Sequence, residues 1–205
     1  MIIIDTDTDS ETNTFSETNG FRLTDDGIAA TALLGTTVDR MDRLNTLAGR
    51  ALIVVVDDRA AHGDVEDESG PLVGELLRED GFLVDGTVVV ASDEVEIRKA
   101  LNTAVIGGVD LVVSVGGTGV SPRDVTPEVT IEILDREIPG IAEALRSSAL
   151  AAGSIEGGLS RGVAGISGST LVVNLAGTRE SIRDGMATLA RLARHVIGDL
   201  SRVDE

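Results

Sequence analysis

Apolar runs alternate along the chain with stretches in which apolar positions recur at helical spacing. The runs that predict buried strands are Ala51–Val56, Phe82–Val90, Asp110–Val115 and Thr170–Leu175. Continuous apolar runs of this length are typical of strands that are buried on both faces. Strands that alternate with helices predict an α/β fold in which helices cover both faces of a parallel sheet.

The helical segments carry signals for where they begin. Apolar residues at helical spacing mark Leu72–Leu77, Ile97–Val105, Ile138–Leu145 and Ile182–Leu200. Asp93 and Glu96 form the D-x-x-E arrangement of a helix N-terminus, so Asp93 is expected to cap the second of these helices. Another helix is expected to begin at Thr126, with the threonine hydroxyl as its cap and Pro127 at the first helical position.

The first part of the chain differs in composition from the rest. Residues 1–20 contain acids but no basic residue, and they show no helical periodicity. Such a segment cannot bury enough apolar surface to offset the entropy lost on ordering. We therefore expect an acidic, disordered N-terminal extension at residues 1–47 and a folded domain at residues 48–205. Met41 is then a candidate start site for the protein.

Composition and charge exclude several classes of function. The chain has no Cys, which excludes disulfides, thiolate catalysis and Cys-ligated metals. Its formal net charge of −18 opposes nonspecific binding to nucleic acid or to an anionic membrane. No apolar run is long enough to span a bilayer, so a cytoplasmic protein is expected. Lys99 is the only lysine and lies on an expected helix surface, which argues against lysine-based chemistry.

The strongest chemical signal is the glycine-rich loop that follows the strand ending at Val115. Gly116, Gly117 and Gly119 surround Thr118. Glycines can adopt positive φ and expose backbone N–H groups to an anionic or planar ligand, although a tight turn without a ligand would use the same residues. The spacing fits neither a dinucleotide-binding fingerprint nor a Walker loop. Ligands bind beyond the carboxyl ends of strands in such sheets. The loops at these ends are Asp57–Gly70, Gly116–Pro127 and Ala176–Ser181.

The segment Val115–Glu128, with the sequence VGGTGVSPRDVTPE, resembles the signature of the MoaB/Mog family. Shorter matches occur in order at Val56–Arg59, Asp67–Pro71, Arg136–Gly140, Leu159–Arg161 and Leu175–Gly177. The resemblance extends from Gly49 to about Leu200 and is greatest to MoaB-like members. One departure is Ala176, which stands where the family usually has a proline.

This resemblance implies a fold, an activity and an assembly. The fold is a three-layer α/β/α molybdopterin-binding domain with a mostly parallel sheet, assembled as a homotrimer. Members of the Mog type transfer AMP from Mg-ATP to the terminal phosphate of molybdopterin, and the product passes to a molybdenum-insertion protein. Asp93 and Asp124 match the two aspartates associated with this activity. Both are expected to be catalytic and to hold Mg²⁺, which prefers oxygen ligands.

Further site residues are expected from the same resemblance. The residues expected to bind the substrate are Gly116, Gly117, Thr118, Gly119, Arg123, Ser160 and Arg161. The residues expected on the nucleotide side are Asp57, Asp67, Gly70 and Gly177. Several of these have purely structural alternatives. Asp93 could serve only as a helix cap, Asp124 only as a support for the loop and Asp67 only as a surface acid, while Ser160 and Arg161 could form a simple turn.

Two functions from different classes follow. The first is an enzyme, a molybdopterin adenylyltransferase, and the presence of Asp93, Asp124 and both arginines favours it. The alternative is a catalytically weak trimer that binds molybdopterin, its adenylylated form or another protein. Ala176 and the acidic extension favour this alternative, because alanine lacks the fixed φ of proline. A molybdate-inserting relative would normally carry further domains.

Overall fold

The computed structural model describes residues 47–201, so the expected disordered extension lies outside the described residues except for Leu47. Within this range, six strands form one sheet in the order β2-β1-β3-β6-β5-β4. The strands are β1 (Gly49–Val56), β2 (Phe82–Val90), β3 (Leu111–Val115), β4 (Arg136–Glu137), β5 (Ala164–Ser167) and β6 (Thr170–Leu175). The pairs β2–β1, β1–β3 and β3–β6 are parallel, and β6–β5 and β5–β4 are antiparallel. The expectation of a mostly parallel sheet is confirmed.

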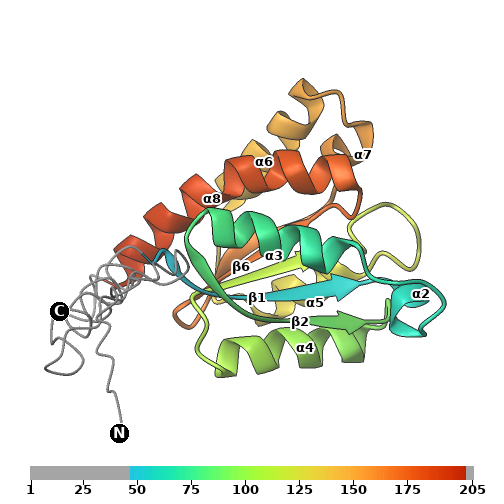
Figure 1. Ribbon diagram of the computed structural model, residues 1–205, viewed down its shortest axis with the longest axis horizontal. Coiled ribbons are helices and arrows are strands. Elements are labelled where there is room, and N and C mark those ends of the chain that lie inside the picture. The colour runs from blue at the N-terminus through green and yellow to red at the C-terminus, as the bar shows by residue number, and fades with distance from the viewer. Residues whose placement is uncertain (1–46, 202–205) are drawn as a thin grey trace, which may run out of the picture. The chain divides into compact units, whose positions relative to one another are not determined.

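Helices cover both faces of this sheet. The helices are α2 (Asp58–Ala61), α3 (Ser69–Glu79), α4 (Glu94–Ile106), α5 (Thr126–Ile133), α6 (Pro139–Ala151), α7 (Ile155–Gly158) and α8 (Arg179–Ser201). Figure 1 shows α3 and α8 on one face and α4 on the other. Apolar residues of α6 pack in the same core cluster as those of α3 and α8, whereas α5 packs with α4. The three-layer α/β/α architecture is confirmed.

The two core clusters explain why the strands are continuous apolar runs. In β1, Ile53 and Val55 belong to the cluster beneath α3 and α8, while Val54 and Val56 belong to the cluster beneath α4. Successive side chains of a strand point to opposite faces, so a strand covered on both sides buries apolar residues on both of its faces.

Helix starts followed the sequence signals in one case and departed from them in another. Asp93 caps α4, because its Oδ1 accepts from the N–H groups of Val95 at 2.9 Å and Glu96 at 3.1 Å. The prediction that Thr126 caps α5 is wrong, since α5 begins at Thr126 itself and Pro127 is the second helical residue. The buried Thr126 hydroxyl instead donates to the carbonyl of Gly116 at 3.0 Å and supports the glycine loop. No helix within residues 47–201 is long and apolar enough to cross a membrane.

Candidate active site

The three loops singled out from the sequence meet at the carboxyl edge of the parallel strands. The register pairs Val55 with Val115 and Val115 with Leu175, so β1, β3 and β6 end side by side. The N–H of Gly116 donates to the carbonyl of Leu175 at 3.0 Å. A Cβ on Gly177 would lie 3.3 Å from Gly116 Cα, so the loops after β3 and β6 are in close contact.

The first two glycines of the loop are required by geometry. Gly116 has φ 97° and Gly117 has φ 62°, a conformation that side chains disfavour. A Cβ on Gly116 would also overlap the carbonyl oxygen of Val56, and one on Gly117 would overlap Thr126 Oγ1. The backbone of the loop therefore packs directly against β1 and α5, which holds its peptide groups in place at the sheet edge.

Asp124 supports the loop and still keeps one oxygen available. Its Oδ2 accepts from the N–H of Ser121 at 2.8 Å, and its own N–H donates to the Ser121 carbonyl at 2.9 Å. Asp93 is similar, because both of its cap hydrogen bonds reach Oδ1. Within residues 47–201, no hydrogen bond reaches Oδ1 of Asp124 or Oδ2 of Asp93. The structural roles are thus real, and each aspartate retains an oxygen for a ligand.

Arg161 ties the far side of the loop together. Its Nε donates to the Gly119 carbonyl at 2.6 Å, and its guanidinium also contacts the Asp124 carbonyl and the Glu128 carboxylate. The hydrogen bond from Arg161 lowers the pKa of Glu128. The Arg161 N–H donates to the Thr118 carbonyl at 2.8 Å. Arg161 therefore holds the loop in shape through both its backbone and its side chain.

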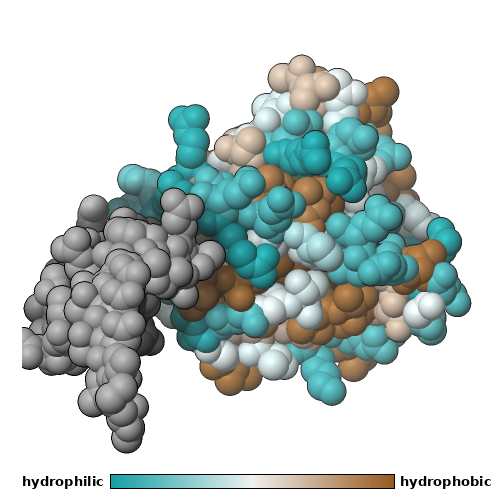
Figure 2. Space-filling view, in the orientation of Figure 1, coloured by the Kyte–Doolittle hydropathy of each residue, from teal (hydrophilic) through white to brown (hydrophobic). Residues whose placement is uncertain are grey.

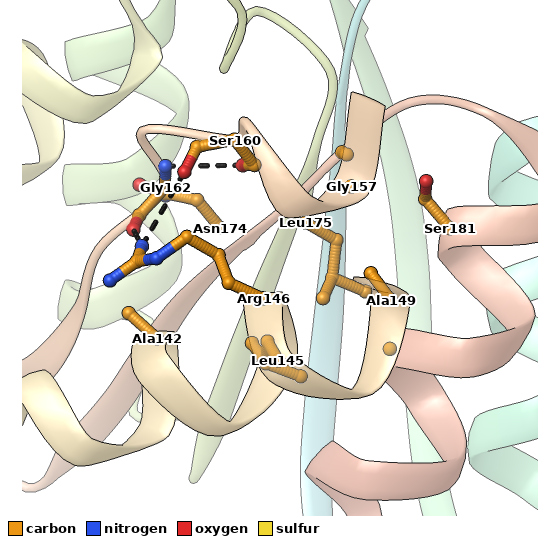
Figure 3. Close-up of a pocket in the computed structure, with 12 residues that line it drawn as sticks. Ala142, Leu145, Arg146, Ala149, Gly157, Ser160, Gly162, Asn174, Leu175 and Ser181 are labelled. Carbon is orange, nitrogen blue, oxygen red and sulfur yellow. Dashed lines mark hydrogen bonds between the residues drawn. The ribbon is translucent and has the colours of Figure 1, made fainter. Parts of the chain in front are cut away.

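Arg146, a residue that the sequence analysis missed, binds the backbone at Ser160. Figure 3 shows Arg146 reaching from α6 toward Ser160 and Gly162, and its Nη1 donates to the two carbonyls at 3.4 and 3.0 Å. Ser160 Oγ in turn donates to Thr118 Oγ1 at 2.9 Å. The cavity beside Arg146 has a volume of only about 20 Å³, which is room for about one water molecule. Arg146 therefore supports the site without lining a ligand cavity of its own.

Asp58 is a second residue that the sequence analysis missed. It connects the segments that follow β1, β2 and β3. Arg123 Nε donates to Asp58 Oδ2 at 2.8 Å, and Ser92 donates its N–H to Oδ1 at 2.8 Å. The hydrogen bond from Arg123 lowers the pKa of Asp58. The pKa of Arg123 is raised, mainly by Asp58 and to a smaller extent by the charge of Asp93. Arg123 is thus paired with a carboxylate, and the charge of Asp93 lies close enough to act on it.

The residues expected on the nucleotide side are divided between two places. Gly177 lines the cleft beside the glycine loop. Asp57 caps α2 by accepting from Arg59 and Ala60, and Asp67 accepts from the N–H groups of Ser69 and Gly70 at the start of α3. The structure therefore makes Asp57 the cap of α2, and the Asp67 carboxylate binds the first N–H groups of α3.

A cleft of about 460 Å³ lies over the glycine loop, within the usual range for a small-molecule site. The residues that line it are Gly116, Gly117, Thr118, Gly119, Val120, Ser121, Asp124, Glu156, Leu159, Ala176, Gly177 and Thr178. The cleft thus unites the glycine loop, Asp124 and Gly177. Four other expected site residues do not line the cleft: Arg123, Ser160, Arg161 and Asp93.

No group of three His, Cys, Asp or Glu side chains within residues 47–201 is arranged to hold a metal ion. These residues therefore do not form a metal site made of protein ligands alone. Mg²⁺ is commonly held by one or two carboxylates together with water and substrate phosphates. Asp93 and Asp124 each keep one carboxylate oxygen that could serve as such a ligand.

These features define an α/β protein whose small-molecule cleft is built on a glycine loop at the carboxyl edge of a parallel sheet. The family model described as the probable molybdopterin binding domain matches residues 52–195. The chain belongs to this family, which confirms the resemblance to MoaB/Mog proteins.

Similar proteins support this assignment, and this chain covers different shares of their lengths. The molybdenum cofactor biosynthesis bifunctional protein of Synechococcus elongatus is 32% identical over 75% of this chain, and the chain spans only 48% of that protein. The molybdopterin adenylyltransferase of Pyrococcus furiosus is 31% identical, with 71% of this chain and 87% of that protein covered. A crystal structure of a molybdopterin biosynthesis protein from Mycobacterium abscessus is 66% identical with a TM-score of 0.75, covering 77% of this chain and 99% of that one.

Proposed function

We propose that this protein binds molybdopterin and adenylylates it with Mg-ATP. The observation that carries the proposal is the glycine-loop cleft, which Asp124 lines with one carboxylate oxygen free of hydrogen bonds from the described residues. Asp93 lies outside the lining and also keeps one such oxygen. The similarity to the Pyrococcus furiosus protein named molybdopterin adenylyltransferase extends over most of that protein's length.

The proposed reaction joins two anionic substrates. A terminal phosphate oxygen of molybdopterin attacks the α-phosphorus of ATP, a new P–O bond forms, and the bond to pyrophosphate breaks. Backbone N–H groups of Gly117, Thr118 and Gly119 bind the pterin phosphate, whereas the N–H of Gly116 already donates to the Leu175 carbonyl. Asp93 and Asp124 hold Mg²⁺, which neutralises charge on the reacting phosphates when bound.

The two arginines take different parts in this proposal. Arg161 is engaged with two carbonyls of the loop and with Glu128 of α5, so it keeps the loop and Ser160 in position. Arg123 is 65% exposed and has one carboxylate partner, Asp58. A substrate phosphate can share or replace that partner, because guanidinium binds phosphate and carboxylate in the same forked manner. Gly177 lines the nucleotide side of the cleft, and Asp57, Asp67 and Gly70 shape the neighbouring loop.

Pyrophosphate release from Mg-ATP in the presence of molybdopterin is the direct test. We expect release that depends on both substrates. Tight binding of molybdopterin without release would favour the alternative of a catalytically weak binding protein. Ala176, which lines the cleft where related proteins usually have proline, is the observation that favours this alternative.

The assembly and the cellular context are part of the same proposal. We expect a cytoplasmic homotrimer that passes adenylylated molybdopterin to a molybdenum-insertion protein. Sedimentation equilibrium of the full chain tests the assembly. A mass of three chains at micromolar concentration supports it, and a monomer at all concentrations contradicts it.

A further inference from the structure

Two large apolar side chains are exposed at the cleft. Val120 is 82% exposed and Leu159 is 64% exposed, and both line the space over the glycine loop. Figure 2 shows hydrophobic residues at the surface in the part of the molecule where Figure 1 places α7, the helix that Leu159 follows. Binding is favoured when a ligand covers apolar side chains that are otherwise exposed to water.

The loop presents Val120 in a fixed position. The carbonyl of Gly119, immediately before it, accepts from Arg161 Nε at 2.6 Å. The N–H of Ser121, immediately after it, donates to Asp124 Oδ2 at 2.8 Å. Both neighbours of Val120 are therefore tied down, so the exposure of this side chain does not result from a loose loop.

Close packing of α7 on α6 fixes Leu159. A Cβ on Gly157 would lie 2.6 Å from Ala149 Cβ, and one on Gly158 would overlap the side chain of Leu150. These glycines let α7 lie directly against α6, and the Leu159 N–H donates to the Ile155 carbonyl at 2.9 Å. Leu159 thus also reaches the cleft from a rigid element.

The composition of the chain determines how such a cleft can hold a flat ring. The sequence has no Tyr or Trp, and Phe82, the one Phe within residues 47–201, is only 3% exposed. Stacking on one of these aromatic side chains is therefore excluded in the described part of the chain. The cleft instead offers the aliphatic side chains of Val120 and Leu159 beside the backbone of the glycine loop.

We propose that Val120 and Leu159 cover the flat heteroaromatic ring of a substrate and determine its specificity, while the glycine loop binds the attached phosphate. This inference rests on the proposed function and deepens it, because molybdopterin carries a pterin ring system and ATP an adenine ring in the same molecule as a phosphate. Covering two aliphatic side chains supplies affinity for the ring that a ring-free phosphate does not obtain.

Calorimetric binding to the full-length protein tests the proposal with three probes. AMP carries the adenine ring, ribose 5-phosphate is its ring-free counterpart, and 6-hydroxymethylpterin carries the pterin ring. Leu159→Asn should weaken binding of AMP, 6-hydroxymethylpterin or both by about tenfold, whereas Leu159→Met should restore it. Val120→Thr should act in the same direction to a smaller extent. Affinity for ribose 5-phosphate should stay the same in all of these variants.

Ile155→Asn is the matched control. Ile155 is 71% exposed and belongs to α7, but it does not line the glycine-loop cleft. This variant should bind every probe as the native protein does. The probe whose affinity falls in Leu159→Asn shows whether Leu159 covers the adenine ring or the pterin ring.

Two results would overturn the proposal. One is native affinity of Leu159→Asn and Val120→Thr for both ring-bearing probes. The other is equal weakening of AMP and ribose 5-phosphate, which would indicate a distorted phosphate site. If the native protein binds a ring in the predicted manner but releases no pyrophosphate with molybdopterin and Mg-ATP, the proposed function fails while this inference stands.

Discussion

The side-chain amide of Asn174 donates a 2.7 Å hydrogen bond to Ser114 Oγ in the core of the domain, where the two residues are only 3% and 0% exposed. The same amide donates to Thr130 Oγ1 at 3.0 Å, and Asn174 Oδ1 accepts from the Val163 N–H at 3.1 Å. This buried network joins β6, β3 and α5 directly before the glycine loop begins at Gly116. The position of the loop therefore depends on polar groups that are buried in the core.

Replacing Asn174 with Leu should destabilise the fold. The substitution leaves the Val163 N–H and two buried hydroxyls without their partner, and each unsatisfied buried group costs about 1–3 kcal/mol. We expect the free energy of unfolding in urea to fall by about 3 kcal/mol. Asn102→Leu, at an exposed position of α4, should change it by less than about 0.5 kcal/mol. A change at Asn174 as small as that at Asn102 would contradict the importance of the network.

Gly116→Ala should damage the site more than a positive φ alone explains. Gly63 also has positive φ, at 78°, but a Cβ there meets nothing within 4 Å. Gly63→Ala should therefore cost only the conformational penalty of about 1–2 kcal/mol. Gly116→Ala adds a clash with the Val56 carbonyl oxygen, a backbone atom that cannot move without disturbing β1. Thermal unfolding should show a distinctly larger loss for Gly116→Ala, and equal losses would show that the backbone yields at little cost.

The fold was predictable where burial dictates the sequence. The bounds of β2 and β6, Phe82–Val90 and Thr170–Leu175, agree with the predicted runs, because both strands are mostly apolar and pack against the core. The strand Arg136–Glu137 was not predicted, since two exposed charged residues carry no strand signal. Its pairing with β5 is a property of the folded chain rather than of either segment.

The site was predictable where a single segment contains the chemistry. The glycine loop stands out from the sequence, and the resemblance pointed to Asp93 and Asp124. Asp58 and Arg146 were missed, because their importance lies in contacts with residues that are distant in the sequence. A charged residue on an amphipathic helix, such as Arg146, has the same local pattern as a solvated surface residue.

The ion pair between Asp58 and Arg123 should make stability depend on pH in a defined direction. The hydrogen bond from Arg123 lowers the pKa of Asp58 in the folded state. A lowered folded pKa contributes stability above the unfolded pKa of about 3.9, and this contribution is lost as the pH falls through the folded pKa. Asp58→Asn should therefore lower the melting temperature at pH 7, and the difference from the native protein should shrink as the pH falls below about 3.9.

Asp64→Asn is the control for this titration. Asp64 is an exposed acid in the same loop, and its side chain makes no hydrogen bond or ion pair within residues 47–201. The melting temperature of this variant should follow that of the native protein across the same pH range. A difference between Asp58→Asn and native protein that stays constant down to pH 3 would show that the pair contributes no charge-dependent stability.

The last prediction separates the chemical role of Asp124 from its structural one. Asp124→Asn keeps an oxygen that can accept from the Ser121 N–H, so the loop should remain closed and the melting temperature should change by no more than about 2 °C. The substitution removes the negative charge that would hold Mg²⁺. Pyrophosphate release should fall by at least about a hundredfold, since metal stabilisation of the reacting phosphates contributes several kcal/mol.

Glu75→Gln, which removes a charge from an exposed position of α3, should leave both quantities unchanged. A near-native rate in Asp124→Asn would show that the free carboxylate oxygen has no part in the reaction. A large drop in melting temperature with a proportionate loss of rate would instead show that the charge itself closes the loop against the Ser121 N–H. Only a stable Asp124→Asn variant with a lost rate assigns Asp124 to the chemistry, because the same hydrogen bond is present in both proteins.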